Sequence, residues 1–261
     1  MNLCSKKDLV DLLARHRIAL ARTYGQHFLV ECRVLKKIAE LAGSEKDLPT
    51  IEVGPGVGTL TRELAKNSAP VFAIERDQRF LPVLKETLAE YKNVEVVLGD
   101  ALKVSLAGLI SGDYGSGDYQ IVSNLPYEIT TPFLWKVLFD EPRRPKRMVL
   151  LLQAELVERV LQQPPKMNLL SLLAAFSGKA GKAFLVSQTS FYPPPRVRSA
   201  VLTIENIAPA LSSEVRQAIN LARRAFGAPR KKLGNTLGEM ADRFADQRPA
   251  KLSADEWFEI A

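Results

Sequence analysis

The chain has 261 residues, of which 46% are hydrophobic and 25% are charged, and it carries a formal net charge of +7. This balance excludes a disordered chain and favours a globular protein, and no apolar run reaches the roughly 18 residues that a membrane span requires. Because the N-terminal residues also lack a signal-peptide core, we expect a cytoplasmic protein with no membrane partner.

The first 37 residues hold both cysteines and a motif that precedes the first predicted strand of the sheet. Cys4 and Cys32 stand apart, without a CxxC spacing or a Cys/His cluster, so we expect two free thiols rather than a disulfide or a zinc site. The motif GQHFL, at residues 25–29, is expected to close over a ligand with Gln26 and His27 facing it. A purely structural histidine is the alternative.

Residues 50–205 alternate short β-branched runs with stretches of helical period, which is typical of a mainly parallel sheet covered by helices. Seven strands are predicted, at Thr50–Val53, Val71–Glu75, Val94–Leu98, Tyr119–Ser123, Arg147–Leu152, Ala183–Ser187 and Ala200–Glu205. Four helices are predicted, at Leu60–Lys66, Arg79–Tyr91, Pro132–Phe139 and Glu155–Leu161. The segment Ser111–Asp118 is rich in glycine, serine and aspartate, which predicts a surface loop.

The sharpest local signal is EVGPGVG at residues 52–58, where the first strand runs into a glycine turn and then a helix. Glycines such as Gly54 and Gly56 let the backbone turn tightly and let a ligand approach closely. The third glycine comes one residue earlier than in the dinucleotide fingerprint. The spacing therefore favours a nucleoside ligand without a pyrophosphate, best fitted by S-adenosylmethionine, over NAD. A turn with only a structural role remains the alternative.

Acidic residues end the next two strands, at the edge where α/β sheets bind ligands. Glu75 lies at the distance past the glycines where an acid meets ribose hydroxyls, and its carboxylate can accept from both of them. Asp100, followed by Ala101, can accept a hydrogen bond from an adenine amine. Each acid alone is as well explained by a helix cap or a solvated charge, but their shared position favours a cofactor site.

The fourth strand is followed by Asn124-Leu125-Pro126-Tyr127. An adenine amine is a poor nucleophile because its lone pair is delocalised into the ring. Hydrogen bonds from the amine to the Asn124 oxygen and to the carbonyl of Leu125 or Pro126 would direct that lone pair toward a methyl donor, while Tyr127 offers a ring for base stacking. The alternative is a turn with a buried tyrosine. We expect no metal and no general base.

The motif FYPPP begins at Phe191, just before the last strand. Stiff prolines could hold the Phe191 ring against the other face of a target base, although a proline-rich hairpin loop explains the motif nearly as well. After Asn206 the alternation stops, and three helices are predicted, at Ser212–Phe226, Asn235–Phe244 and Ser253–Ile260. We therefore place a domain boundary between residues 1–205 and a small helical domain at residues 206–261.

Positive charge is concentrated in three parts of the chain. The clusters comprise Lys6, Lys7, Arg15, Arg17, Arg22, Arg33, Lys36 and Lys37; Arg143, Arg144, Lys146 and Arg147; and Arg223, Arg224, Arg230, Lys231 and Lys232. One such cluster is as well explained by a solvated face, but three together favour a polyanionic partner.

The motifs, taken in order, resemble the KsgA family of small-subunit ribosomal RNA adenine dimethyltransferases. The resemblance extends from about residue 22 to about residue 240 and is carried by GQHFL, EVGPGVG, Glu75, GDAL, NLPY, FYPPPRVRSAV and FGAPRKKLGNTL. The resemblance implies a Rossmann-like methyltransferase domain followed by an RNA-contacting helical domain. It further implies S-adenosylmethionine as the methyl donor and dimethylation of two adjacent adenines near the 3′ end of the RNA in a 30S-type particle. We expect a monomer.

The resemblance also assigns roles to single residues. The cofactor positions that it implies are His27, Leu29, Gly54, Glu75, Asp100 and Asn124, and the target base would also meet Asn124 and Tyr127. To these the motifs themselves add Gly56 and Ala101 as cofactor positions and Phe191 as a catalytic position. The chain departs from the family in having Ser123 where glycine usually precedes NLPY, and His27 where asparagine is frequent. Neither change alters a group invoked in the chemistry.

Three alternatives remain at this level. The Erm family, which methylates a large-subunit adenine, shares the catalytic layout, but NLPY and the segment at residues 230–233 resemble KsgA more. A mitochondrial relative that aids transcription is disfavoured because no transit peptide is evident. A NAD-dependent dehydrogenase is disfavoured by the glycine spacing.

Overall fold

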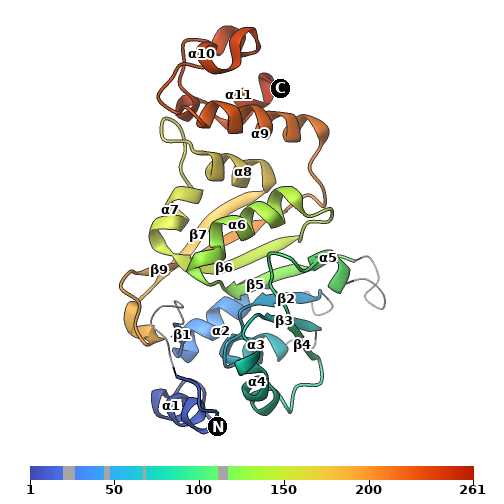
Figure 1. The fold of residues 1–261 in the computed structure, drawn as a ribbon, viewed down its shortest axis with the longest axis vertical. Coiled ribbons are helices and arrows are strands. Elements are labelled where there is room, and N and C mark those ends of the chain that lie inside the picture. Colours follow the sequence, from blue (N-terminus) through green and yellow to red (C-terminus); the bar gives the residue numbers. More distant parts are fainter. Residues whose placement is uncertain (20–26, 44–47, 67–68, 111–116) are drawn as a thin grey trace.

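The computed structural model describes the chain except for residues 20–26, 44–47, 67–68 and 111–116. A seven-stranded sheet with the order β4-β3-β2-β5-β6-β9-β7 forms its centre, as the sequence predicts (Figure 1). The strands are β2 (Thr50–Val53), β3 (Val71–Glu75), β4 (Val94–Leu98), β5 (Gln120–Asn124), β6 (Arg147–Gln153), β7 (Lys179–Val186) and β9 (Ser199–Glu205). The strands from β4 to β6 are parallel, and β9 runs antiparallel to both β6 and β7.

Helices cover both faces of the sheet because its central strands are apolar on both sides. In β6, Met148 and Leu150 pack with one core cluster, whereas Val149 and Leu151 pack with another, which is the alternation expected of a strand. The helices of the first face are α5 (Leu106–Leu109), α6 (Thr130–Trp135), α7 (Ala154–Val160) and α8 (Leu169–Ser177). The opposite face is covered by α2 (Cys32–Leu41) and α3 (Thr59–Ala65).

Most predicted elements are confirmed, with some differences in extent. Strand β7 begins at Lys179 rather than Ala183, and its register against β9 shifts between Lys182 and Phe184. The helix predicted at Arg79–Tyr91 is shorter, comprising a 3-10 turn at Gln78–Phe80 and α4 (Leu81–Thr87). Of the predicted loop at Ser111–Asp118, residues 111–116 lie outside the described part of the chain.

The C-terminal helices are α9 (Ser213–Phe226), α10 (Gly234–Leu237) and α11 (Ala254–Glu259), which lie at one end of the molecule in Figure 1. The continuous helix predicted at Asn235–Phe244 is wrong, because Gly238 takes a φ of +64° and only 3-10 turns follow it. A core of their own includes the fully buried Trp257. Helix α8 also reaches this core through Leu172, so the boundary after residue 205 stays a prediction.

The N-terminal region differs most from expectation. Helix α1 (Lys6–Arg15) was not predicted; it buries Leu9 and Leu12 against residues of α4 and against Phe28. Cys4 and Cys32 are joined by a disulfide with a Cα–Cα distance of 5.6 Å, so the expectation of free thiols is wrong. The spacing could not reveal this bond, because the partners meet only once the segment before α1 lies beside the start of α2.

A small two-stranded sheet, also not predicted, joins two of the motifs. Strand β1 (Phe28–Leu29) pairs antiparallel with β8 (Phe191–Tyr192), and Val30 N donates to Ser190 O at 2.8 Å. This pairing fixes the end of GQHFL beside FYPPP, although residues 25 and 26 of GQHFL lie outside the described part of the chain. Across the described residues, no helix combines the length and apolar character needed to cross a membrane.

Candidate functional site

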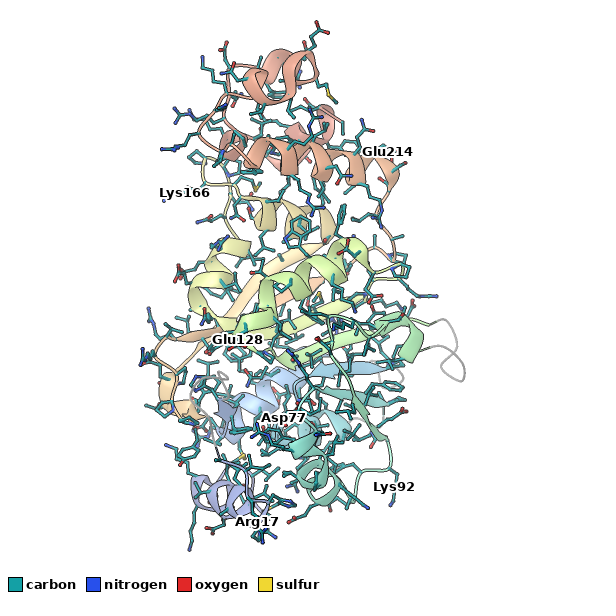
Figure 2. All side chains as sticks on the ribbon, in the orientation of Figure 1. Arg17, Asp77, Lys92, Glu128, Lys166 and Glu214 are labelled. Atoms are coloured by element: carbon teal, nitrogen blue, oxygen red, sulfur yellow. A yellow bond between two sulfur atoms is a disulfide. The ribbon has the colours of Figure 1, made fainter. Side chains whose placement is uncertain are left out.

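A cavity of about 890 Å³ opens at the carboxyl ends of β2, β3, β4 and β5. The chain leaves β2 toward β3 and β4 on one side and returns to β5 on the other, so this is the point where strand order reverses and α/β sheets bind ligands. Figure 2 shows Asp77 and Glu128, which both line it, near the middle of the molecule. Nine predicted site residues line the cavity, namely His27, Leu29, Gly54, Gly56, Glu75, Asp100, Ala101, Asn124 and Tyr127.

The glycine turn forms the floor of this cavity and has no room for side chains. Gly54 and Gly56 have φ angles of +69° and +58°, which L-residues rarely adopt. A Cβ at Gly56 would also lie 2.8 Å from the Phe28 ring. The turn therefore brings bare backbone to the cavity, as the sequence predicts.

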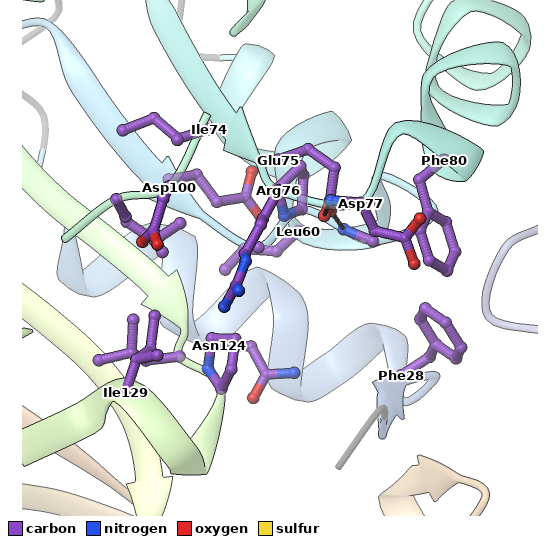
Figure 3. Close-up of a pocket in the computed structure, with 18 of the residues that line it drawn as sticks. Phe28, Leu60, Ile74, Glu75, Arg76, Asp77, Phe80, Asp100, Asn124 and Ile129 are labelled. Atoms are coloured by element: carbon purple, nitrogen blue, oxygen red, sulfur yellow. Dashed lines mark hydrogen bonds between the residues drawn. The ribbon is translucent and has the colours of Figure 1, made fainter. Parts of the chain in front are cut away.

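Glu75 ties the end of β3 to the glycine turn. Its Oε2 accepts from Gly56 N at 3.3 Å and its Oε1 from Asp77 N at 2.8 Å, and the residue is only 7% exposed. Burial raises the pKa of this carboxyl, while the two backbone donors oppose the rise. These hydrogen bonds fix the orientation of the Glu75 carboxylate in the cavity. Asp100 lies at the end of the adjacent strand and lines the same cavity (Figure 3).

A further acid, Glu52, also lines the cavity, and the sequence analysis gave it no role. It is 2% exposed, and its Oε2 has no hydrogen-bond partner among the described residues. Burial raises the pKa of Glu52 to about 8. An acid inside a four-residue strand that is otherwise apolar or hydroxyl-bearing was the available signal, because a carboxyl is rarely buried without a reason.

Arg76 was also missed. It lines the cavity, is exposed, and extends toward Asn124 in Figure 3. Its signal was its position, directly after the strand-end acid Glu75. Its guanidinium carries a permanent positive charge, which none of the nine predicted residues that line the cavity supplies.

Asn124 and Tyr127 form the side of the cavity opposite Glu75. Asn124 Nδ2 donates to His27 O at 3.2 Å, which turns the amide so that its oxygen is available to accept from a ligand. The Tyr127 hydroxyl is 3.0 Å from Ser199 Oγ, and burial raises the pKa of this phenol, so it is neutral. His27 Nδ1 contacts Pro193 O at 2.7 Å, which ties this histidine to FYPPP.

Two residues outside this set need comment. Ser123, which stands where glycine is usual in the resembled family, is buried and donates to Val53 O at 2.6 Å, so it braces β5 against β2. Phe191 does not line the cavity: it is 1% exposed and packs with Leu29 and other core residues. Stacking of Phe191 on a base thus stays a prediction, and it would require these covering residues to move.

The three basic clusters differ in the structure. The second is only partly exposed: Arg144 is 2% exposed and donates to Ser177 O, whereas Arg143 and Lys146 reach solvent and both pair with Asp118. Arg147 donates to the backbone of α2. In the third cluster Arg224, Arg230 and Lys231 are exposed, as are the described members of the first cluster, whereas Arg22 lies outside the described residues.

Comparison with known proteins identifies the family of the chain. A family profile described as "Ribosomal RNA adenine dimethylase" matches residues 18–254. The chain belongs to this family. The ribosomal RNA small subunit methyltransferase A of Mesorhizobium japonicum is 38% identical over 275 residues, which cover 100% of this chain and 99% of that protein. The protein of the same name from Listeria welshimeri is 35% identical, over 92% of this chain and 82% of that protein.

Solved structures support the fold of this dimethylase. A dimethyladenosine transferase from Plasmodium falciparum has a TM-score of 0.72 at 22% identity, and the match covers 87% of this chain and 94% of that chain. The 23S rRNA methyltransferase ErmE has a TM-score of 0.71 at 24% identity, over 89% of this chain and 98% of that one. At these identities the likeness shows a shared methyltransferase fold and leaves the choice of RNA to other observations.

Proposed function

We propose that this chain transfers methyl groups from S-adenosylmethionine to the N6 amines of two adjacent adenines near the 3′ end of small-subunit ribosomal RNA, giving N6,N6-dimethyladenosine. The family supports the reaction, and the names of the curated relatives support the small subunit. The observation that carries the proposal is the cavity itself, where an available Asn124 amide oxygen faces two strand-end acids.

The described residues fit the cofactor. Glu75 can accept from ribose hydroxyls, and Asp100 from the adenine amine, while its Oδ1 also accepts from Leu102 N at 3.0 Å. The unpartnered Oε2 of Glu52 suits a positively charged group, which would favour its ionised form. Bound there, S-adenosylmethionine would supply an electrophilic methyl on a positively charged sulfur.

The protein's own contribution is to orient the target amine. The Asn124 oxygen can accept one amine hydrogen, and the Leu125 carbonyl a second. We favour Leu125 over Pro126, because Pro126 O already accepts from Thr130 Oγ1 at 3.0 Å and from Ile129 N. Tyr127 would fix the plane of the base by stacking. No general base is needed, since the amine proton becomes acidic only after methyl transfer and can leave to water.

The RNA would lie along the exposed basic residues of the third cluster, with the helices after residue 206 as a contact region. We propose a monomer acting on a 30S-type particle without metal, and a cytoplasmic location because ribosomal RNA is there. A cytoplasmic location does not explain the Cys4–Cys32 disulfide, because the thiols of cytoplasmic proteins are usually reduced.

The test is a methylation assay with labelled S-adenosylmethionine on two substrates: small-subunit particles that lack the modification, and large-subunit ribosomal RNA. We expect label in the small-subunit RNA alone. Label in the large-subunit RNA alone would support the Erm-type alternative. No label in either, with cofactor binding shown by calorimetry, would support a binding role and overturn the proposal.

A further inference from the structure

The helix that follows NLPY carries a buried charge pair behind the cavity. The chain continues from Asn124 through a 3-10 turn (Tyr127–Ile129) into α6 and then into a π-helical turn (Lys136–Asp140). Lys136 begins this turn, and Glu141 directly follows it. The Lys136 and Glu141 side chains are 16% and 3% exposed, and Lys136 Nζ lies 2.8 Å from Glu141 Oε1. Isolated π-helical turns are rare and often occur at functional sites.

The partners of this pair lie on a different segment, the loop that follows Asp100. Lys136 Nζ donates to Ala101 O at 3.0 Å and to Val104 O, so that with Glu141 its three hydrogens have three acceptors. Glu141 Oε1 also accepts from Leu106 N at 3.3 Å, at the far end of the same loop. The pair therefore holds the loop from behind at three points.

This arrangement links the two sides of the cavity. Asp100 and Ala101 line it at the end of β4, and Asn124 and Tyr127 line it at the end of β5. No strand pairing joins β4 to β5, because β3 and β2 lie between them. The Lys136 side chain spans this gap, since it starts on the helix that follows Tyr127 and ends on the carbonyls that follow Asp100. Burying two charges is costly unless their remaining hydrogen-bonding groups also find partners. The two loop carbonyls accept the Lys136 hydrogens that do not point to Glu141.

We propose that Lys136 and Glu141 are positioning residues for the methyl-transfer reaction. They fix Asp100 and Ala101 at the spacing from Asn124 that the bound nucleoside requires, and they touch neither cofactor nor RNA. This inference rests on the proposed function for its ligand, S-adenosylmethionine, but its deciding measurement, cofactor affinity, needs no RNA.

The decisive variant is Lys136→Met, which keeps the length and the packing of the stem but removes the charge and the donors. We expect its dissociation constant for S-adenosylmethionine, measured by calorimetry, to rise about 10-fold, because the loop loses a charge-assisted anchor. The turnover number at saturating cofactor should remain within about 2-fold of the wild-type value, because Asn124 is unchanged. The matched control is Lys103→Met, at an exposed lysine of the same loop, which should bind normally.

Glu141→Gln provides a second test if Lys136→Met fails to fold. It retains an oxygen for Leu106 N but loses the charge facing Lys136, so we expect a smaller rise, of about 3-fold. Unchanged cofactor affinity in either folded variant would overturn the proposal, as would an equal loss in Lys103→Met. If affinity rises as expected and no RNA is methylated even by the wild type, the positioning role survives and the proposed function fails.

Discussion

The two sides of the cavity hold their functional groups in different ways. On the cofactor side, Glu52 and Glu75 are buried carboxyls at 2% and 7% exposure, and Glu75 is fixed by two backbone donors. On the target side, Asn124 and Tyr127 are neutral and half-buried, and among the described residues the side chain of each makes one hydrogen bond to another segment. In the proposed function, the cofactor side would bind charge and hydroxyls, whereas the target side would orient an amine. Substitutions should therefore affect affinity on one side and rate on the other.

The largest effect is expected at Asn124. Asn124→Ala removes the oxygen that orients the amine, so the single-turnover rate should fall by about 10²-fold or more, as for loss of a preorganised catalytic dipole. RNA binding should hardly change, because phosphates dominate affinity. Rapid-quench measurement with saturating cofactor tests this, and a wild-type rate would show that the amine is oriented elsewhere.

Glu75→Ala should act on affinity instead. Loss of a charged hydrogen-bonding group is expected to weaken S-adenosylmethionine binding by about 1.5–3 kcal/mol or more. Since Glu75 also braces Gly56, Glu75→Gln is the shape control: it keeps an acceptor oxygen and should lose less. Calorimetry on variants shown to be folded by circular dichroism measures both. Equal affinities of wild type and Glu75→Ala would remove Glu75 from the cofactor site.

Two substitutions of Tyr127 distinguish a stacking role of its ring from a hydrogen-bonding role of its hydroxyl. Its hydroxyl lies within hydrogen-bond distance of Ser199 Oγ, which is not a group of the proposed reaction, so Tyr127→Phe should retain most activity. Tyr127→Ala removes the ring, and stacking on one base is worth about 1–3 kcal/mol. The comparison is made in kcat/KM for RNA with cofactor in excess. Inactivity of Tyr127→Phe would mean that the hydroxyl, and not the ring, is the functional group.

RNA affinity should depend on the third basic cluster, which belongs to neither side of the cavity. Neutralising Arg230, Lys231 and Lys232 should flatten the slope of log affinity against log salt by about 2 units, if each contacts one phosphate. The matched control neutralises Arg143 and Lys146, whose partner is Asp118, and should keep the wild-type slope. Filter binding at several salt concentrations measures both, and the reverse result would place the RNA on the second cluster.

The last prediction concerns stability rather than rate or affinity. Burial raises the pKa of Glu52 from 4.5 to about 8, so the folded protein holds this proton more tightly than the unfolded chain. Its stabilising contribution is complete below pH 4.5 and is lost as pH rises through about 8. Glu52→Gln cannot ionise, so above pH 8 it should be more stable than the wild type, with little difference at pH 4. Denaturant unfolding of both proteins at the two pH values measures this. A difference in the free energy of unfolding between Glu52→Gln and wild type that stays the same at both pH values would contradict the prediction.

The cofactor side could be predicted from sequence because its groups follow strand ends. Short runs rich in β-branched residues locate β2, β3 and β4, and a polar residue at or directly after the carboxyl end of such a strand must lie at the same edge of the sheet. Glu75 and Asp100 follow from that rule alone. Glu52 does not, because it lies inside β2 rather than after it. Its place in an otherwise apolar or hydroxyl-bearing strand was the signal, and the structure adds that its Oε2 is buried without a hydrogen-bond partner among the described residues.

Other features depend on contacts between distant segments. The pairing of Leu29 with Phe191 and the bond between Cys4 and Cys32 require the N-terminal residues to fold back, which no local pattern specifies. Charge clusters have the same limitation: Arg144 and Arg230 look alike in sequence, yet one is buried against backbone carbonyls and the other is exposed. Local patterns thus indicate which residues gather at strand ends, but not which way a long side chain points.

The most direct test is the product itself. Small-subunit particles lacking the modification are incubated with the protein and S-adenosylmethionine, and their RNA is digested and analysed by nucleoside and fragment mass spectrometry. N6,N6-dimethyladenosine at two adjacent positions near the 3′ end, absent from reactions with Asn124→Ala on the single-turnover time scale, is the predicted result. Monomethyladenosine only, methylation at another base, or equal product from Asn124→Ala would contradict the account.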